Sequence, residues 1–181
     1  FLLFFSLFSL TEYYPESDSW NISNPEIEGI NQDKVDKLMD LSFSDDATQA
    51  VVIVKNGKII SERYSEGYDK NSHGTSWSMA KSYYAALIGI SIDLGEIESL
   101  DEKVKNYLEY YNDKRSEITI RDLLNMSSGL DFPSHEHEKM FFQVDHLKYA
   151  KKVNLEKNPG EKFEYNNVNS MILGEILLQA T

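Results

Sequence analysis

Residues 50–64 (AVVIVKNGKIISERY) place Asn56 and Gly57 between two runs rich in β-branched residues. Asn-Gly is the strongest short-range signal for a β-hairpin, because both central residues of a type I′ turn need the positive φ angles that Asn and Gly tolerate. A lone hairpin is only marginally stable in water, and no convincing further strand follows it. The chain is therefore expected to contribute one hairpin of a larger sheet, followed by a long helical region.

Helical patterns lie on both sides of this hairpin. Before it, residues 31–41 place apolar residues at helical spacing after Asn31, which favours a short amphipathic helix with an Asn cap. After it, a possible capping box at residues 99–102 predicts a helix that continues through Tyr110. The segments expected to be helical are residues 31–41, 77–94, 99–110, 119–126 and 168–180, whereas residues 131–152 are expected to be irregular.

The composition limits the possible partners. The net charge is −12, from 18 Lys and Arg against 30 Asp and Glu, and no basic cluster is present that could offset repulsion from phosphate groups. Nucleic acid and anionic membrane surfaces are therefore not expected as partners. The chain has no cysteine, which excludes a disulfide scaffold and a thiol nucleophile.

The chain begins FLLFFSLFSL, an apolar run too short to span a bilayer as a helix. The run is typical of the hydrophobic core of a secretory signal that lacks its basic start. A retained N-terminal anchor is the main alternative, and a buried strand or helix is another. We interpret residues 1–10 as the remnant of a signal peptide or anchor and residues 11–26 as a polar linker. The protein is therefore expected to be exported: periplasmic, extracellular or anchored to the membrane.

Ser78 and Lys81 lie in the first turn of the apolar stretch WSMAKSYYAALIGISI. Residues three and four apart share one face of a helix, so Ser78, Lys81 and Ser82 point the same way. Burial in an apolar helix and the positive end of the helix dipole both disfavour a lysine cation and lower its pKa. A hydroxyl nucleophile needs such a base beside it. The alternative is a capping serine followed by a lysine that reaches solvent.

A second motif follows the Pro159-Gly160 turn, where Tyr165 and Asn167 stand at the start of the last apolar helix. Tyr110-Tyr111-Asn112 has the same spacing. We interpret it as the end of a charged surface helix, where the tyrosines serve as amphipathic cover and the Asn as a helix stop.

Three blocks in order, SMAKS, DLLNMSSGL and PGEKFEYNN, are followed by an apolar helix that contains LGEIL. Together they resemble the serine β-lactamase and penicillin-binding-protein superfamily. The resemblance is greatest to the class C-like branch of esterases, D-Ala-D-Ala peptidases and 6-aminohexanoate-dimer hydrolases, and it covers residues 27–181. It implies an α+β fold, with an antiparallel sheet flanked by helices and a helical subdomain.

One family motif, a Lys/His-x-Gly sequence on a strand of the main sheet, is absent from the chain. Residues 27–181 are therefore expected to be the N-terminal part of a catalytic domain whose C-terminal part is missing, with only the N-terminal hairpin of the sheet. The sequence is expected to be truncated at both ends.

The resemblance also implies roles for four residues. Ser78 would be the acylated nucleophile, Lys81 its base, and Tyr165 the group that carries the proton to the leaving group. Asn167 would hydrogen-bond Lys81 or the substrate. The predicted function is that of a serine hydrolase, with no metal or organic cofactor, that cleaves an ester or amide bond of a small substrate.

Several alternatives stay open. The enzyme could act on cell-wall peptides as a β-lactamase or D-Ala-D-Ala carboxypeptidase, or the chain could be a non-catalytic relative that binds peptidoglycan or another ligand. Histidines in residues 134–138 and His146 could suggest a metal site, but we interpret them as solvated loop residues because they lack metal-ligand spacing.

The aromatic residues of the segment 131–150 bear on the choice of substrate. Residues 140–142 could line a substrate cleft or pack beneath their own loop. If Phe141, Phe142 and Tyr149 lie near a cleft on this acidic chain, they suit a neutral or cationic acyl chain better than an anionic β-lactam. An esterase or amidase is therefore favoured.

Overall fold

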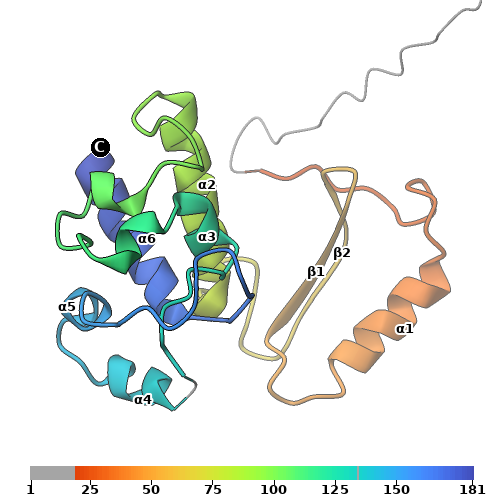
Figure 1. Ribbon diagram of the computed structural model, residues 1–181. Coiled ribbons are helices and arrows are strands. Elements are labelled where there is room, and N and C mark those ends of the chain that lie inside the picture. Colours follow the sequence, from red (N-terminus) through yellow and green to blue (C-terminus); the bar gives the residue numbers. More distant parts are fainter. Residues whose placement is uncertain (1–18, 134) are drawn as a thin grey trace, which may run out of the picture. The chain divides into compact units, whose positions relative to one another are not determined.

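The computed structural model describes residues 19–133 and 135–181. Its contacts divide it into two compact units, with the boundary between Gly74 and Thr75. The elements in chain order are α1 (Gln32–Ser42), β1 (Ala50–Lys55), β2 (Lys58–Tyr64), the 3₁₀ helix η1 (Trp77–Met79), α2 (Ala80–Asp93), the 3₁₀ helices η2 (Val104–Asn106) and η3 (Lys114–Glu117), α3 (Ile120–Leu124), α4 (Glu136–Phe141), α5 (His146–Ala150) and α6 (Asn167–Ala180) (Figure 1).

The first unit contains the predicted hairpin. β1 and β2 pair antiparallel, with an irregularity in the register between Ile53 and Val54. Asn56 (φ 49°) and Gly57 (φ 71°) form the connecting turn, and both have the positive φ angles of a type I′ turn. Ile22 also pairs with Ile59 in a short parallel bridge. Part of the segment interpreted as a linker therefore lies along β2, whereas residues 1–10 lie outside the described residues.

Helix α1 begins after Asn31, as predicted. The side chain of Asn31 accepts a hydrogen bond from the Lys34 backbone N–H at 3.0 Å, which caps the first turn. The buried face consists of Val35 and Met39, which are four residues apart. Leu38 is instead 48% exposed, so the apolar spacing in the sequence located the helix but assigned part of its buried face wrongly.

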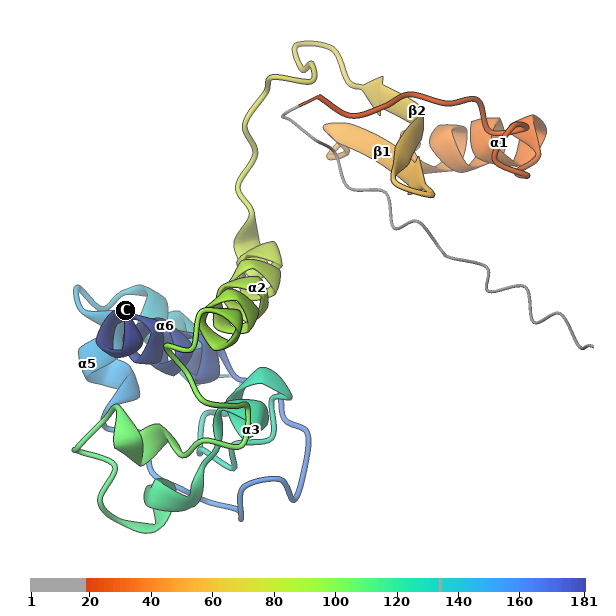
Figure 2. The ribbon, with the colours of Figure 1, turned by 90° about the horizontal axis from the view of Figure 1, so that it is seen from above.

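The second unit is built around helices α2 and α6, which lie side by side (Figure 2). Gly174 on α6 faces Tyr84 on α2, and a Cβ atom added at Gly174 would lie 3.3 Å from the Tyr84 ring. Glycine therefore lets the two helices approach closely. The buried hydrophobic cluster of this unit comprises Ile88, Ile97, Val104, Leu108, Tyr111, Ile118, Ile120, Leu123, Leu130, Phe132, Met140, Ala150, Val153, Val168, Ile172, Leu173 and Ile176.

The expectation that the helix after Trp77 is buried nearly all round is wrong. α2 buries Ile88 and Ser91, whereas Tyr83 is 66% exposed and Ile90 52% exposed. Its packing against α6 involves the side that carries Tyr84. The predicted end of the helix is confirmed, because Gly95 follows it with a φ of 76°.

The predicted helix over residues 99–110 is also wrong. This segment forms only the short 3₁₀ helix η2, because its backbone pairs with residues 118–121 instead of with itself. The Val104 N–H donates to Ile118 O, and Arg121 N donates to Leu100 O. Tyr111 was interpreted as surface cover, but it is fully buried and is among the largest buried side chains.

The segment from Asp131 to Lys152 is more regular than expected. It contains α4 and α5, each only one to two turns long. Asp145 caps α5 by accepting a hydrogen bond from the Lys148 backbone N–H at 2.8 Å. The predicted helix after Thr119 is confirmed as α3, and Thr119 and Asp122 form its capping box.

Across residues 19–133 and 135–181, no helix is both long enough and apolar enough to cross a membrane.

Candidate active site

The nucleophile candidate lies where η1 passes into α2. Trp77, directly before Ser78, has a φ of 43°, a left-handed conformation that is uncommon and costly for a bulky residue. Residues 77–79 form the 3₁₀ turn and α2 continues from Ala80. Ser78 and Lys81 are three residues apart at this junction, so both side chains reach the same side of the helix start.

The second half of the site is held by the start of α6. Asn166 is buried and caps the helix, because its side chain accepts a hydrogen bond from the Val168 backbone N–H at 2.9 Å. Its side-chain amide donates to the Leu130 carbonyl at 3.1 Å. Tyr165 and Asn167 flank this fixed residue, so both stand on a backbone that is tied to the core.

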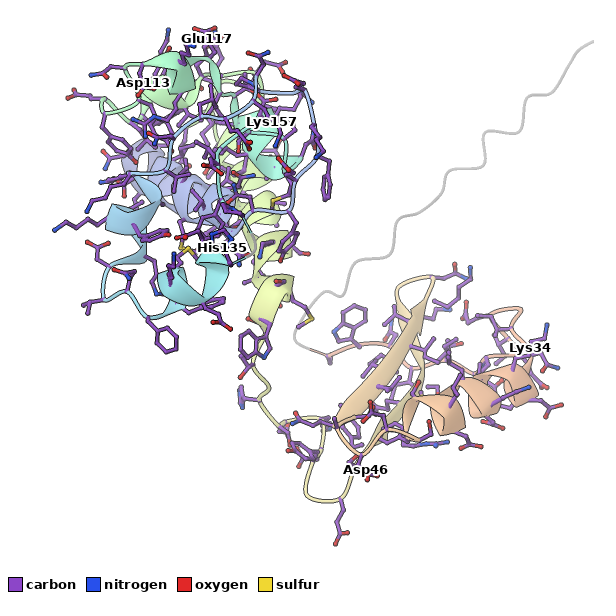
Figure 3. All side chains as sticks on the ribbon, turned by 60° about the horizontal axis from the view of Figure 1, so that its bottom comes forward. Lys34, Asp46, Asp113, Glu117, His135 and Lys157 are labelled. Atoms are coloured by element: carbon purple, nitrogen blue, oxygen red, sulfur yellow. The ribbon has the colours of Figure 1, made fainter. Side chains whose placement is uncertain are left out.

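The DLLNMSSGL segment positions the turn that leads to Tyr165. The Gly160 backbone N–H donates to Ser127 O at 2.8 Å, and the Glu164 N–H donates to Met126 O at 2.7 Å. Lys157, labelled in Figure 3, adds an ion pair with Glu164 at 2.6 Å. This segment therefore acts as the support of the second motif.

Four side chains meet between the two helix starts. Ser78 Oγ lies 2.6 Å from the hydroxyl of Tyr165, and Lys81 Nζ donates to Ser78 Oγ at 3.2 Å. Lys81 Nζ also donates to Asn167 Oδ1 at 2.8 Å. The structure thus brings together all four residues that the sequence singled out, and it places two titratable groups within reach of one hydroxyl.

The electrostatics of this group centre on Lys81. The side-chain hydrogen bond with Lys81 has the largest effect on the pKa of Tyr165 and lowers it below the ordinary value near 10. The hydrogen bond with Ser78 lowers it further, whereas partial burial opposes the shift. Lys81 Nζ lies 4.8 Å from the centre of the Tyr165 ring. A positively charged amine beside a phenol stabilises the phenolate, so Tyr165 gives up its proton more readily than an ordinary tyrosine.

The other Tyr-x-Asn sequence has the opposite environment. Burial raises the pKa of Tyr110, the tyrosine that corresponds in spacing to Tyr165, and the Tyr110 and Tyr111 rings pack edge to face with centroids 5.0 Å apart. The Tyr110 hydroxyl is buried and has no hydrogen-bond partner among the described residues. This pair belongs to the core of the second unit.

A cavity of about 180 Å³ adjoins Ser78 and Lys81. Met140 and Phe141 from α4 line it, together with residues of α2, α5 and α6. Phe142, in contrast, is 86% exposed, and Tyr149 lines a different cavity. Of the three aromatic residues expected near a cleft, Phe141 therefore lies beside the nucleophile candidate.

Sequence reasoning missed the supporting residues of the site. Asn166 lies within the second motif but was assigned no role, although an Asn before an apolar helix is a typical N-cap signal. Ser128 Oγ donates to Asn169 Oδ1 at 2.7 Å, and both side chains are buried. A bond between residues so far apart leaves no spacing signal in the sequence.

Within the part of the chain that the structure describes, no group of three or more His, Cys, Asp or Glu side chains could hold a metal ion.

Comparison with known proteins agrees with this geometry. The family model described as Beta-lactamase matches residues 38–181. The chain therefore belongs to the Beta-lactamase family, within the serine β-lactamase-related superfamily.

The individual curated proteins that match this chain are only about a quarter identical to it. Protein flp of Staphylococcus aureus strain N315 is 27% identical over 170 residues, an alignment that covers 83% of this chain and 34% of that protein. The sequence of strain COL is 26% identical over the same coverage. The chain thus spans about a third of the length of these curated relatives.

Two solved structures share the fold. One is a Bacillus anthracis protein that carries the provisional name 6-aminohexanoate-dimer hydrolase, with a TM-score of 0.64 and 22% identity over 81% of this chain and 42% of that one. The other, from Bacteroides dorei DSM 17855, is provisionally named a beta-lactamase. It has a TM-score of 0.66 and 24% identity over 83% of this chain and 46% of that one. The two strands and the helices of the present chain are consistent with part of that α+β domain.

Proposed function

We propose that the protein is a serine hydrolase that forms an acyl-enzyme on Ser78 and cleaves an ester or amide bond of a small substrate. The observation that carries the proposal is the contact of Ser78 Oγ with both Tyr165, at 2.6 Å, and Lys81, at 3.2 Å. A serine hydroxyl is a weak nucleophile unless an adjacent base removes its proton. A purely structural role gives no reason for this arrangement.

The proposed reaction has two steps. Ser78 Oγ attacks the substrate carbonyl as its proton passes to Lys81, and the C–O or C–N bond then breaks as Tyr165 delivers a proton to the leaving atom. Water attacks the resulting ester of Ser78, which releases the acid and restores the hydroxyl. Asn167 holds Lys81 through its 2.8 Å hydrogen bond. The Ser78 backbone N–H, at the start of the helical segment, is our candidate for one oxyanion donor.

Tyr165 suits the role of proton carrier because its pKa is lowered by Lys81 and by the Ser78 hydrogen bond. A general acid or base works best when its pKa lies near the working pH. Since Lys81 and Tyr165 also interact directly, a proton taken up by Lys81 can pass to Tyr165 and from there to the leaving atom.

Covalent labelling tests this proposal. The purified protein is treated with a fluorophosphonate probe, and the labelled peptide is identified by mass spectrometry. We expect one adduct on Ser78 that is lost in Ser78→Ala and strongly slowed in Lys81→Ala. Ser82→Ala is the matched control, because Ser82 lies about one turn beyond Ser78, within α2, and it should label at the normal rate.

The same experiment separates the proposal from a non-catalytic binding role. A protein that only binds peptidoglycan or another ligand would show no adduct at Ser78 above the level of Ser78→Ala. Labelling spread evenly over several serines would also contradict an activated nucleophile.

We further propose that linear esters or amides are preferred over β-lactams and D-Ala-D-Ala peptides. The aromatic and apolar residues beside Ser78, among them Phe141, support a neutral acyl group. Comparison of kcat/KM for a p-nitrophenyl ester and a chromogenic cephalosporin, with Ser78→Ala as the blank, checks this preference. A cephalosporin preference of tenfold or more, about 1.4 kcal/mol in transition-state binding, would reverse it.

We also propose that the protein is exported, which its apolar first ten residues led us to expect. Fractionation of producing cells, with the activity that depends on Ser78 as the marker, tests it.

A further inference from the structure

The cavity beside Ser78 is mainly apolar and is lined by residues of η1, α2, α4, α5 and α6 in the second unit. Trp77 lines it from η1, Tyr84 from α2, Met140 and Phe141 from α4, and Met171 from α6. Met140 is 1% exposed, so one wall is part of the hydrophobic core. Binding pockets for small molecules share this character, with apolar walls and a few placed polar groups.

The volume of the cavity, about 180 Å³, limits what it can hold. An engineered apolar cavity of about 150 Å³ binds benzene, whereas whole drug-sized ligands occupy roughly 300 Å³ or more. The cavity beside Ser78 can therefore take a group of about six carbon atoms, which is one part of a substrate and not the whole.

Ser78 and Tyr165 distinguish the two sides of the bond that is broken. In the proposed reaction the acyl carbon becomes attached to Ser78, whereas Tyr165 delivers a proton to the leaving atom. Ser78 lines the apolar cavity, while Tyr165 lines a separate cavity of about 240 Å³ together with Asp131, Glu156 and Glu164. The apolar cavity thus lies on the side that receives the acyl group.

Ser170 adds a polar group to this apolar cavity. It lines the cavity from α6, one turn beyond Asn167, and is 4% exposed. Its hydroxyl is buried with no hydrogen-bond partner among the described residues, although a helical serine commonly bonds to the carbonyl four residues before it. An unpaired buried hydroxyl costs free energy, and an acceptor atom on a bound ligand would remove that cost.

We propose that this cavity is the acyl-binding pocket and that Ser170 selects acyl groups carrying a hydrogen-bond acceptor. The preferred substrate class is esters or amides of acids with about six carbons or one aromatic ring, with an ether or carbonyl oxygen within the acyl chain. The inference rests on the proposed acyl-enzyme at Ser78 and deepens it.

Chain-length dependence tests the pocket itself. With p-nitrophenyl acetate, hexanoate and dodecanoate, we expect kcat/KM to peak at hexanoate. Phe141→Ala removes part of one wall and should lower the hexanoate-to-acetate ratio several-fold, since about 0.8 kcal/mol is gained for each buried CH₂ group. Phe142→Ala is the matched control, because Phe142 is its neighbour but is 86% exposed, and it should leave the ratio unchanged.

A pair of nearly isosteric esters tests Ser170. p-Nitrophenyl phenoxyacetate and p-nitrophenyl 3-phenylpropanoate differ by an ether oxygen in place of a CH₂ group. Ser170→Ala should lower kcat/KM for the ether ester about fivefold relative to the carbon ester, the range of one hydrogen bond. Taking the ratio in both proteins cancels the different intrinsic reactivities of the two esters. Ser82→Ala should leave the ratio unchanged.

The outcomes separate the two levels of inference. If the parent protein hydrolyses none of these esters faster than Ser78→Ala does, the proposed function itself is contradicted. Ser78-dependent hydrolysis with no peak at intermediate chain length, or with equal responses to Phe141→Ala and Phe142→Ala, would overturn the pocket and leave the function standing. An unchanged ester ratio in Ser170→Ala would overturn the role of Ser170.

Discussion

The two units of the chain owe their structures to different kinds of interaction. In the first unit, the buried hydrophobic residues among those described are Val35, Met39 and Ile60, and its hairpin is set by two turn residues with positive φ angles. The second unit has a continuous buried cluster that joins α2, α3, α4, α5 and α6. The first unit therefore depends more on local turn chemistry, whereas burial of residues that are distant in sequence dominates the second unit, which also holds the candidate site.

The largest expected effect is the difference in activity between substitutions of two lysines, one in each unit. Lys81 donates a hydrogen bond to the Ser78 hydroxyl. Lys58, the first residue of β2, donates a hydrogen bond to the Glu28 carboxylate. Lys81→Ala should lower kcat by about 10²- to 10⁴-fold, the usual contribution of a general base, whereas Lys58→Ala should retain most activity. Steady-state kinetics with an ester substrate measure both.

Tyr110→Phe is a further control within the second unit. The Tyr110 hydroxyl is buried and has no hydrogen-bond partner among the described residues, so its removal should leave turnover unchanged. Near-normal turnover in Lys81→Ala, with a melting curve like that of the parent, would show that the assignment of Lys81 as base is wrong.

The next largest expected effect is a difference in lost stability between a core residue of the second unit and a strand residue of the first. Ile172 on α6 is fully buried, whereas Val52 on β1 is 47% exposed. Ile172→Ala should lower the free energy of unfolding by about 2–5 kcal/mol, because it leaves a cavity in a packed core. Val52→Ala should cost less than about 1 kcal/mol. Urea unfolding curves of the two variants test the contrast, and equal losses would contradict it.

Two glycines sharpen the comparison further. Gly29 (φ 76°) and Gly129 (φ 75°) have the same left-handed backbone, which costs about 1–2 kcal/mol for other residues. A Cβ atom at Gly29 meets nothing within 4 Å, but at Gly129 it would lie 2.2 Å from the Lys157 carbonyl oxygen. Gly29→Ala should therefore cost only the backbone strain, while Gly129→Ala should cost more and also shift the turn before Tyr165.

The readout for this pair is both stability and activity. Gly129→Ala is expected to lower the rate of Ser78 labelling, because Gly129 accepts backbone hydrogen bonds from Glu156 and Lys157. Gly29→Ala should label at the normal rate. Similar stability losses in both variants, with normal labelling in both, would show that the close approach at Gly129 is unimportant.

The smallest expected effect is a pH dependence in the first unit. Glu28 accepts hydrogen bonds from Lys58, Ser23 and Asn56, and these lower its pKa to about 2 from a reference value of 4.5. A carboxyl whose pKa is lower in the folded state contributes stability above its unfolded pKa. That contribution should be complete above about pH 4.5 and disappear as the pH falls toward 2.

Tryptophan fluorescence can follow this effect in one unit. The chain has two tryptophans, Trp20 in the first unit and Trp77 in the second, so Trp77→Phe leaves Trp20 as the reporter. Glu28→Gln should flatten the loss of stability between pH 4.5 and 2. An unchanged acid profile would mean that the three hydrogen bonds of Glu28 contribute no measurable linkage.

The sequence predicted the parts that depend on neighbouring residues. The Asn56-Gly57 turn, the Asn31 cap and the helix that begins after Thr119 were all predicted, because the interactions that specify them lie within a few positions of each other. The segment 99–110 carried a similar cap signal but pairs instead with residues 118–121. Tertiary pairing overrode a local preference there, and it also buried Tyr111.

The candidate site shows the same division between local features, which the sequence predicted, and contacts between distant residues, which it did not. The spacing of Ser78 and Lys81 indicated that they share a face, and a turn before an apolar helix singled out Tyr165. Their meeting was expected only from the family resemblance, since no spacing rule relates two motifs so far apart. The supporting roles of Asn166 and Ser128 were not predicted, because their partners, Leu130 and Asn169, are distant in sequence.

The bond between Ser78 and Tyr165 spans 87 residues, and this separation has a consequence for folding kinetics. Isolated helices form within about a microsecond, but contacts between distant segments form more slowly because the intervening chain must first be ordered. The site therefore exists only after α2 and α6 have docked. During refolding, helical circular dichroism should recover first, and reactivity of Ser78 should appear later as a direct signal of that docking.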